Sequence, residues 1–303
     1  MTLLDKTLVR LLPVVPKPVV QLFSARYIAG ATLDDAVESV RALNGVGKLA
    51  TVDVLGEEIT REEEARAIAQ AYCDVFAAIE REGLDSNASV KPTALGLDLS
   101  YELCRENLEA ILHEAEKNAN FVRIDMEDSA TTSDTLQLYA DLRDRGFENV
   151  GIVLQAYLRR TLDDIRSLAD LKPNVRLCKG IYVEPHSIAF ADYDAVRANY
   201  VRALEALQEI NAYLAIATHD EWLIGQALER VAAPDRRRTY EFQMLLGVRE
   251  QRATELVREG HPLRVYVPFG EHWYQYSLRR LQENPAMAGT IARATVGRML
   301  GRT

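Results

Sequence analysis

Short runs of apolar residues recur along the chain, and longer amphipathic segments separate them. Each run is bounded by polar or turn residues, as expected for a strand that is covered on both faces. The runs predict eight strands, at Leu49–Val54, Ser89–Lys91, Phe121–Met126, Val150–Gln155, Val175–Lys179, Leu214–Thr218, Arg238–Gln243 and Arg264–Val267.

The segments between these runs carry the spacing of amphipathic helices. In residues 61–81 the apolar side chains recur every three or four positions, and residues 102–119 and 192–211 follow the same pattern. A further helix is predicted at residues 33–44, before the first strand, where we expect it to cover the bottom of the fold. Strands that alternate with helices indicate a parallel sheet with right-handed crossovers.

Eight strand–helix units predict an α/β protein of the (β/α)8 TIM-barrel type. A doubly wound open sheet fits less well, because it would leave hydrophilic edge strands that the sequence lacks. We expect residues 1–47 to form an N-terminal helical arm, residues 48–303 to form the catalytic barrel, and a C-terminal helix to lie over that barrel. The arginine-rich tail after residue 284 suits packing onto the barrel better than contact with anionic lipid.

Composition narrows the possible partners and locations. The net charge of −9 argues against broad binding to nucleic acid or to anionic membranes. The three cysteines and five histidines lack the spacing of metal ligands or of a disulfide framework, so we expect no metal and a reducing compartment. The apolar run at residues 8–28 contains three prolines and three basic residues, among them Lys17 and Arg26, so it is too broken to span a membrane. We therefore expect a cytoplasmic protein.

Polar residues gather where the predicted strands end, which is where barrel enzymes carry their chemistry. Charged residues in apolar strands are costly unless they are paired or bind a ligand. These strand-end positions are Lys91, Asp125, Glu127, Gln155, Arg176, Lys179, Gly180, Tyr182, Thr218, His219, Glu241, Gln243, Leu245 and Tyr266.

The segment after the last strand carries the most specific cluster. In RVYVPFGEHWYQYSLRRLQE, residues 264–283, we expect a strand, a Pro-Phe-Gly turn and the start of a helix. Tyr276, Arg279, Arg280 and Glu283 would then share one helix face. Two adjacent arginines are suited to gripping a carboxylate, with Tyr266 and Tyr276 as aromatic walls. The segment predicts a lid over a small anionic substrate.

Several of these residues have a purely structural alternative. Lys91 or Lys179 can instead be the buried ion-pair partner of Asp125, and Glu241 can be that of Arg264.

Two further positions have an equally simple explanation. Thr218 and His219 can form the N-cap of the following helix, a role that Asp220 fits equally well. Arg279 taken alone suits a solvated helix face. The sequence also lacks a nucleotide-binding loop, since Gly45-Val46-Gly47 precedes a strand, so a dinucleotide would have to be held by the barrel mouth.

Seven segments together resemble the proline dehydrogenase family, both its stand-alone bacterial members and the same domain of bifunctional proline utilisation proteins. They occur in the family's order and span residues 49–284. The segments are SVKPTALG (89–96), VRIDMED (122–128), VLQAYLRRT (153–161), VRLCKGIY (175–182), IATHDE (216–221), YEFQMLLG (240–247) and VYVPFGEHWYQYSLRRLQEN (265–284).

The resemblance implies a distorted (β/α)8 barrel that oxidises L-proline to Δ1-pyrroline-5-carboxylate, the first step of proline degradation to glutamate. FAD would be the cofactor, with hydride transfer to flavin N5. Electrons would pass to a quinone, which implies peripheral contact with the inner face of the membrane. Δ1-Pyrroline-5-carboxylate dehydrogenase would be a pathway partner.

The resemblance also assigns roles to residues. Arg279 and Arg280 would clamp the proline carboxylate beside Lys91, which Asp125 would fix in place. Tyr266, Tyr276 and Leu245 would wall the ring. The residues implied around the FAD are Met126, Gln155, Arg176, Lys179, Gly180, Tyr182, Thr218, His219 and Glu283.

The chain departs from the family pattern at a few positions near the cofactor. Ile181-Tyr182-Val183 stands where Ala-Tyr-Trp is usual, Leu246 replaces a histidine, and Met126 replaces a small residue. A separate hypothesis is that Glu57 or Glu58 pairs with Arg279 to close the site.

Two other classes of function compete with this interpretation. A Schiff-base aldolase or lyase would use Lys91 or Lys179 as its nucleophile, but this does not explain the paired arginines and tyrosines. A barrel that only binds a partner would leave the strand-end cluster unexplained. A bound flavin would separate the oxidoreductase from both.

Overall fold

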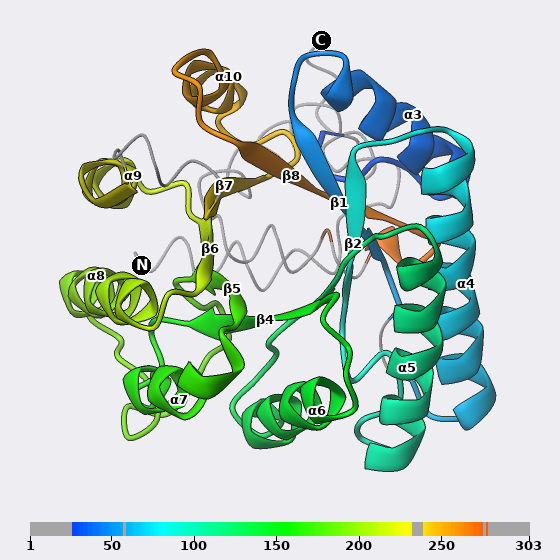
Figure 1. The fold of residues 1–303 in the computed structure, drawn as a ribbon, viewed down its shortest axis with the longest axis horizontal. Helices are drawn as coiled ribbons and strands as arrows, with labels where there is room; N and C mark the ends of the chain where they lie inside the picture. Colours follow the sequence, from blue (N-terminus) through cyan, green and yellow to red (C-terminus); the bar gives the residue numbers. More distant parts are fainter. Residues whose placement is uncertain (1–25, 57–58, 232–238, 275–276, 278–303) are drawn as a thin grey trace, which may run out of the picture.

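Eight parallel strands close into a barrel in the computed structural model, which describes residues 26–56, 59–231, 239–274 and 277 (Figure 1). The strands follow one another around the barrel in chain order, and β8 pairs with β1 to complete it. Their bounds are β1 Leu49–Val54, β2 Ser86–Val90, β3 Val122–Ile124, β4 Val150–Gln155, β5 Asn174–Cys178, β6 Tyr213–Ala217, β7 Tyr240–Leu245 and β8 Leu263–Phe269.

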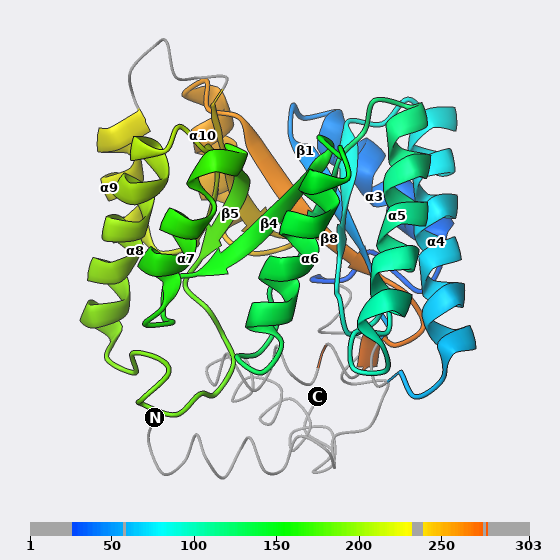
Figure 2. The ribbon, with the colours of Figure 1, turned by 60° about the horizontal axis from the view of Figure 1, so that its bottom comes forward.

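A ring of helices surrounds the strands (Figures 1 and 2). Their bounds are α3 Leu33–Asn44, α4 Glu62–Arg81, α5 Tyr101–Lys117, α6 Thr132–Asp144, α7 Thr161–Ser167, α8 Tyr193–Glu209, α9 Glu221–Val231 and α10 Glu250–Arg258. The predicted (β/α)8 fold is confirmed.

The helices begin where the sequence supplies a cap and pack through one apolar stripe. Ser100 Oγ accepts a hydrogen bond from Leu103 N at the start of α5, and an Asp192 carboxylate oxygen accepts one from Ala195 N at the start of α8. The apolar stripes and the outward-facing strand residues form one continuous core between strands and helices. The barrel interior is therefore left to the side chains that point inward.

The first described helix, α3, does not cover the bottom of the barrel as expected. It packs against β1 and β8 with Ala36, Val37 and Val40 buried, and it also contacts α4. In Figure 1 it completes the ring between α10 and α4. The seam between β8 and β1 has an apolar outer face like every other seam, so it requires a covering helix.

Hydrogen bonds hold the segment around α3 at both ends of the barrel. Ala29 N donates to Pro268 O at 2.9 Å, and Gly270 N donates to Gly30 O at 3.0 Å, where β8 ends. At the other end Asn44 Nδ2 donates to Lys48 O at 2.9 Å, just before β1 begins. The helix thus runs antiparallel to the strands, as the other ring helices do.

The ends of several strands differ from the prediction. β1 and β4 have the predicted bounds, whereas β3 ends at Ile124, so Asp125 and Met126 belong to the following loop. β8 continues through Pro268 and Phe269, where a turn was expected.

Several predictions concern segments that the description does not cover. The C-terminal helix over the barrel falls mostly outside the described residues, and the division of the chain at residue 48 stays a prediction. Within the described ranges no helix is both long and apolar enough to cross a membrane.

Candidate active site

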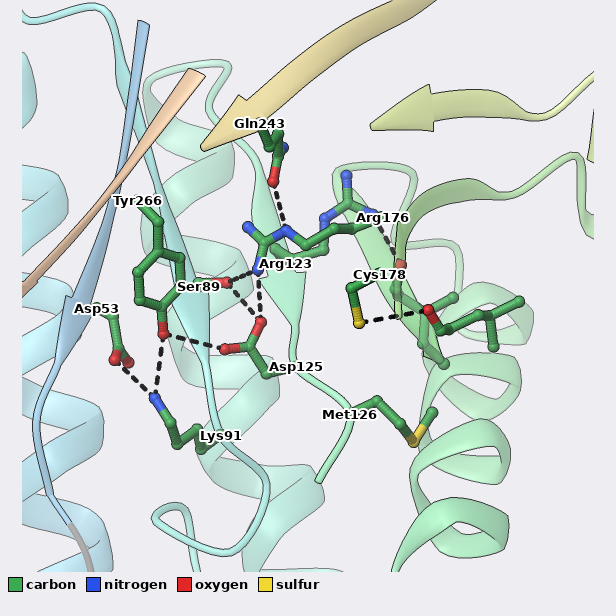
Figure 3. Close-up of polar contacts among 12 residues, drawn as sticks. Asp53, Ser89, Lys91, Arg123, Asp125, Met126, Arg176, Cys178, Gln243 and Tyr266 are labelled. Carbon is green, nitrogen blue, oxygen red and sulfur yellow. Dashed lines mark hydrogen bonds and ion pairs between the residues drawn. The ribbon is translucent and has the colours of Figure 1, made fainter. Parts of the chain in front are cut away.

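A connected group of polar side chains fills the barrel at the carboxyl ends of its strands. Figure 3 shows the members pointing toward one another from β1, β2, β3, β5, β7 and β8. The register explains this convergence, because residues paired across parallel strands face the same side of the sheet. Ser89 pairs with Arg123, and Gln243 pairs with Arg264.

Lys91 lies at the centre of one half of this group. Its Nζ is 2.6 Å from Asp53 Oδ2 and 3.2 Å from Tyr266 Oη. The Asp53 side chain is fully buried, and its second oxygen accepts a hydrogen bond from Tyr72 Oη at 3.1 Å. Asp53 is thus the direct partner of Lys91, where Asp125 was expected.

Asp125 and Arg176 form the other half. Asp125 Oδ1 accepts hydrogen bonds from Ser89 Oγ at 2.7 Å and from Arg176 Nη1 at 2.8 Å. Arg176 Nε donates to Gln243 Oε1 at 2.5 Å. Tyr266 Oη donates to Asp125 Oδ2 at 3.3 Å and so joins the two halves. Lys91 and Arg176 are linked through one tyrosine and one carboxylate.

The charges in this group keep Lys91 protonated. Burial acts to lower the pKa of Lys91, but the carboxylates of Asp53 and Asp125 outweigh it and raise that pKa above its usual value. The carboxylates of Asp53 and Asp125 balance the charges of Lys91 and Arg176. Because the pKa of Lys91 is raised, an anionic ligand that enters the mouth would meet a protonated lysine. A protonated lysine is a poor nucleophile, which argues against Lys91 as a Schiff-base residue.

A second polar layer lies deeper in the barrel. Arg264 Nε is 2.8 Å from Glu241 Oε1, which confirms the structural alternative for Glu241. Arg123 Nη1 donates to the carbonyl oxygens of Ile152 and Asn174. Burial, followed by the charge of Arg176, lowers the pKa of Arg123 to about 9. Gln243 Nε2 donates a hydrogen bond to Glu241 Oε1 at 2.6 Å, which links this layer to Arg176 above it.

The rim at β4 and β5 has an unsatisfied acceptor and a crowded glycine. Gln155 Nε2 donates to the carbonyl oxygens of Met126 and Glu127, while its buried Oε1 has no hydrogen-bond partner within the described structure. Gly180 has φ +101°, and a Cβ there would come within 2.0 Å of the Tyr157 ring. Only glycine fits that position.

The rim at β5 and β6 is organised around Asp220. Lys179 Nζ lies 3.4 Å from Asp220 Oδ2, and Asp220 Oδ1 accepts a hydrogen bond from Trp222 N in the first turn of α9. Asp220 is therefore the cap of α9, and Lys179 is not the partner of Asp125. Thr218 Oγ1 accepts a hydrogen bond from Asp220 N at 3.1 Å and fixes this turn.

The remaining predicted residues lie around the same mouth. His219 Nε2 accepts a hydrogen bond from Leu245 N at 3.0 Å. Leu245 pairs in register with Tyr266, which places it beside the group around Lys91. Met126 is buried in the loop after β3, and Tyr182 packs against the small cluster that contains Tyr157.

Some predicted positions lie outside the described residues. These are Tyr276, Arg279, Arg280 and Glu283, together with Glu57 and Glu58 of the closure hypothesis. Among the residues that the structure does describe, no three histidine, cysteine or acidic side chains are grouped as metal ligands.

Asp53 and Tyr72 belong to the site but were not predicted. The predicted site residues lie at strand ends, whereas Asp53 lies inside β1, one residue before the strand ends. The sequence did contain a signal, since Asp53 is the one charged residue in this strand. Tyr72 was assigned to the apolar stripe of its helix, and nothing in the spacing distinguishes its hydroxyl as a partner of Asp53.

Comparison with known proteins places the chain in a family. A family model described as proline dehydrogenase matches residues 36–293. Proline dehydrogenase 1 of Bacillus subtilis is 41% identical over 273 residues, covering 89% of this chain and 90% of that protein. The proline dehydrogenase of Deinococcus radiodurans is 34% identical over 271 residues, covering 88% and 87%.

A solved structure agrees with this placement. The chain is similar to proline utilization A (PutA) from Bdellovibrio bacteriovorus inactivated by N-propargylglycine, with a TM-score of 0.79 and 26% identity. The similarity covers 86% of this chain but only 32% of that larger one. By sequence, fold and the extent of these matches, the chain belongs to the proline dehydrogenase family.

Proposed function

We propose that this protein oxidises L-proline to Δ1-pyrroline-5-carboxylate with FAD as its cofactor, by hydride transfer to flavin N5, and that the electrons pass on to a quinone. Family membership supports the reaction class, because the curated relatives named proline dehydrogenase match this chain over most of their length. The reaction would be the first step of proline breakdown to glutamate.

The observation that carries the proposal is the connected group from Asp53 to Arg176. It puts a lysine at one end of the mouth, with its pKa raised by the carboxylates of Asp53 and Asp125, and an arginine at the other. Lys91 would bind the proline carboxylate, together with Arg279 and Arg280 of the predicted clamp. Tyr266 and Leu245, adjacent in register, would wall the ring, with Tyr276 as a further predicted wall.

The rim residues fit a flavin. Gln155 Oε1 is a buried acceptor without a partner, as expected of a residue that awaits a donor such as the imide N–H of a flavin. Arg176 Nη2 makes no hydrogen bond within the described part of the chain, so that amino group can face a ligand. FAD would supply the hydride acceptor.

The pocket also favours the reactive form of the substrate. Hydride loss from the carbon next to nitrogen requires a neutral amine, and nearby cations disfavour the ammonium form. Asp53 and Asp125 balance the charges of Lys91 and Arg176, so Arg279 and Arg280 of the predicted clamp would supply the excess of positive charge. Fixing the carboxylate would hold that carbon in one position, which is how a positioning site accelerates a reaction.

The test is to purify the full-length protein and identify any released flavin by chromatography. Oxidation of L-proline with an artificial quinone acceptor is then measured. We expect FAD and proline-dependent turnover. Absence of flavin, combined with covalent trapping of a carbonyl substrate by borohydride, would instead support the lyase alternative.

We further propose that the protein works in the cytoplasm, in contact with the inner face of the membrane where quinone is found. A separate dehydrogenase would consume the product. The relatives named bifunctional protein PutA support this pathway setting, since the chain matches 24% of the Escherichia coli protein at 27% identity.

A further inference from the structure

The seam between β1 and β2 opens before either strand ends. The two strands pair in register only as far as Val52 and Ala88, although β1 runs to Val54 and β2 to Val90. On its other side β1 stays paired with β8 through Val54, and β2 stays paired with β3 through Val90. The opening therefore lies at the carboxyl end of this seam, directly before Lys91.

A tyrosine hydroxyl from the surrounding helix α4 occupies the opening. In a parallel ladder every second residue of a strand donates to the same neighbour, and Ala50 N of β1 donates to Asp85 O beside β2 at 3.0 Å. Continued along β1 in the observed register, this pattern would join Val54 N to Ser89 O. Instead Val54 N donates to Tyr72 Oη at 3.2 Å, and Tyr72 Oη donates to Ser89 O at 2.8 Å. The hydroxyl is inserted into one bond of the ladder.

The hydroxyl of Tyr72 is suited to this place. Helix α4 packs against both strands, and the Tyr72 side chain is buried. The single hydroxyl hydrogen is shared between Ser89 O at 2.8 Å and Asp53 Oδ1 at 3.1 Å. Burial, followed by the charge of Asp53, raises the pKa of Tyr72 well above its usual value, so the group stays a neutral donor. The backbone groups separated by the opening are thereby satisfied.

The same hydroxyl contacts both halves of the polar group in the mouth. On one side Asp53 holds Lys91 Nζ at 2.6 Å. On the other side Ser89 Oγ donates to Asp125 Oδ1 at 2.7 Å and accepts a hydrogen bond from Arg176 Nη1 at 2.9 Å. The separation of the two halves is thus set at the point where the hydroxyl holds β1 and β2 apart (Figure 3).

We propose that Tyr72 is a positioning residue for the substrate carboxylate. Its hydroxyl keeps the seam open and fixes Asp53, and Asp53 in turn fixes Lys91 Nζ at the place where the carboxylate binds. The hydroxyl lies within the sheet, so Tyr72 acts through Lys91 and not on the ligand itself. The inference rests on the proposed function only in taking Lys91 to bind the carboxylate.

Tyr72→Phe removes the hydroxyl and keeps the ring in the core. Val54 N and Ser89 O then either close onto each other and draw the strands together or stay unpaired, and in both cases Asp53 loses a donor. Isothermal titration calorimetry of the full-length holoenzyme compares cyclopentanecarboxylate with the neutral cyclopentanecarboxamide. We expect the carboxylate to bind about fivefold more weakly, as for the loss of one hydrogen bond, and the carboxamide to bind as it does to the wild type.

Tyr200→Phe is the matched control for the loss of a buried hydroxyl. Tyr200 is a fully buried tyrosine of α8 whose Oη donates to Leu177 O of β5 at 2.9 Å. Both variants should be less stable toward urea by similar amounts. Only Tyr72→Phe should weaken the carboxylate, and only Tyr72→Phe should raise KM for proline more than it lowers kcat.

Lys91→Met tests the route through the lysine. In that background Tyr72→Phe should cause no further loss of carboxylate affinity, because the two changes remove the same interaction. A further fivefold loss there, equal losses for carboxylate and carboxamide, or no loss in Tyr72→Phe alone would overturn the inference. If the wild type binds the carboxylate without oxidising proline, the proposed function fails and the calorimetry still decides the role of Tyr72. If it oxidises proline while Tyr72→Phe binds the carboxylate normally, only the inference fails.

Discussion

Asp53 shows how one buried side chain can set the charge of a binding site. A lysine at the mouth of a barrel loses hydration, which by itself would favour the neutral amine. The carboxylate 2.6 Å away reverses that preference and also fixes the position of Nζ. Asp53 does not face the substrate position that we propose, so we regard it as a positioning residue.

The first prediction concerns Asp53→Asn. The variant leaves Lys91 buried beside a neutral amide, so it should lose about 3 kcal/mol in the free energy of unfolding at pH 7. The pair stabilises the wild type below the usual lysine pKa of about 10.4, and this contribution is lost as the pH rises through the raised native pKa. The difference between variant and wild type should therefore shrink in strong alkali, which urea unfolding at several pH values measures.

The same variant should alter catalysis in a way that simple destabilisation does not. Without Asp53 the pKa of Lys91 falls, so the alkaline loss of kcat/KM for proline should move to lower pH, with KM raised more than kcat is lowered. A loss of activity that is equal at every pH would indicate only a damaged fold.

Thr51→Val provides a matched control two positions earlier on the same strand. Thr51 Oγ1 is buried and has no hydrogen-bond partner within the described structure, so its removal relieves an unsatisfied polar group. We expect the free energy of unfolding to rise by about 1 kcal/mol, with an unchanged pH profile for proline oxidation. A large loss of stability would show that this hydroxyl has a partner.

The residues of the site were predictable to different degrees. Lys91, Asp125 and Arg176 follow from polar residues at the ends of apolar strands, and the structure brings all three together. Which acid pairs with which cation was not predictable, because pairing depends on the register between strands. That register decides that Asp53 and not Asp125 contacts Lys91.

At the scale of elements, α3 precedes the first strand and fills the gap in the helix ring between α10 and α4. The amphipathic pattern fixed the bounds of this helix correctly but carried no information about its position. Only the closure of the barrel creates the apolar seam between β8 and β1 that the helix covers.

A valine pair tests this role of α3. Val40 is buried against the barrel, whereas Val46, just beyond the helix, is 60% exposed. Val40→Ala should lower the free energy of unfolding by about 1–3 kcal/mol, and Val46→Ala should change it by less than about 0.5 kcal/mol. Chemical denaturation measures both. Equal effects would mean that α3 does not contribute to the barrel wall.

β8 shows why the predicted turn at Pro268 is wrong and the strand continues through this proline. Phe269 O accepts a hydrogen bond from Leu55 N on the β1 side, so the polar groups of Pro268 face the other side, where β7 has already ended. There the missing N–H of proline costs nothing, and Pro268 O accepts from Ala29 N. The sequence alone does not reveal that the neighbouring strand stops earlier.

The junction between α8 and α9 depends on the ionised form of Asp220. Burial acts to raise the pKa of Asp220, but hydrogen bonds from Arg197 and Tyr193 outweigh it and hold that pKa well below its usual range. The resulting stability is present above about pH 3.9 and is lost as the pH falls through the lower native pKa.

Asp220→Asn should therefore cost at least about 2 kcal/mol in the free energy of unfolding at pH 7 and progressively less below pH 4. Unfolding at the two pH values measures the difference. Asp194→Asn is the matched control, because Asp194 contacts the same arginine at 3.9 Å but is 88% exposed, and it should be close to neutral. A cost for Asp220→Asn that is unchanged in acid would contradict this role.

At the scale of the whole molecule, the barrel gathers residues that are far apart in the sequence into one mouth. Residues from β1 to β8 meet there, and the cations and carboxylates at the proposed substrate side are in balance. The count of strand–helix units predicted this architecture, since eight such units close a barrel. The pattern of charge around the mouth depends on loop positions, which the sequence pattern does not specify.

The central claim is that this mouth oxidises L-proline with a bound flavin. The most direct measurement is anaerobic addition of L-proline to the purified protein, followed at the visible flavin absorbance. The account predicts that L-proline bleaches the flavin and that L-alanine does not. Flavin that stays oxidised with L-proline, or that is bleached equally by both amino acids, would contradict it.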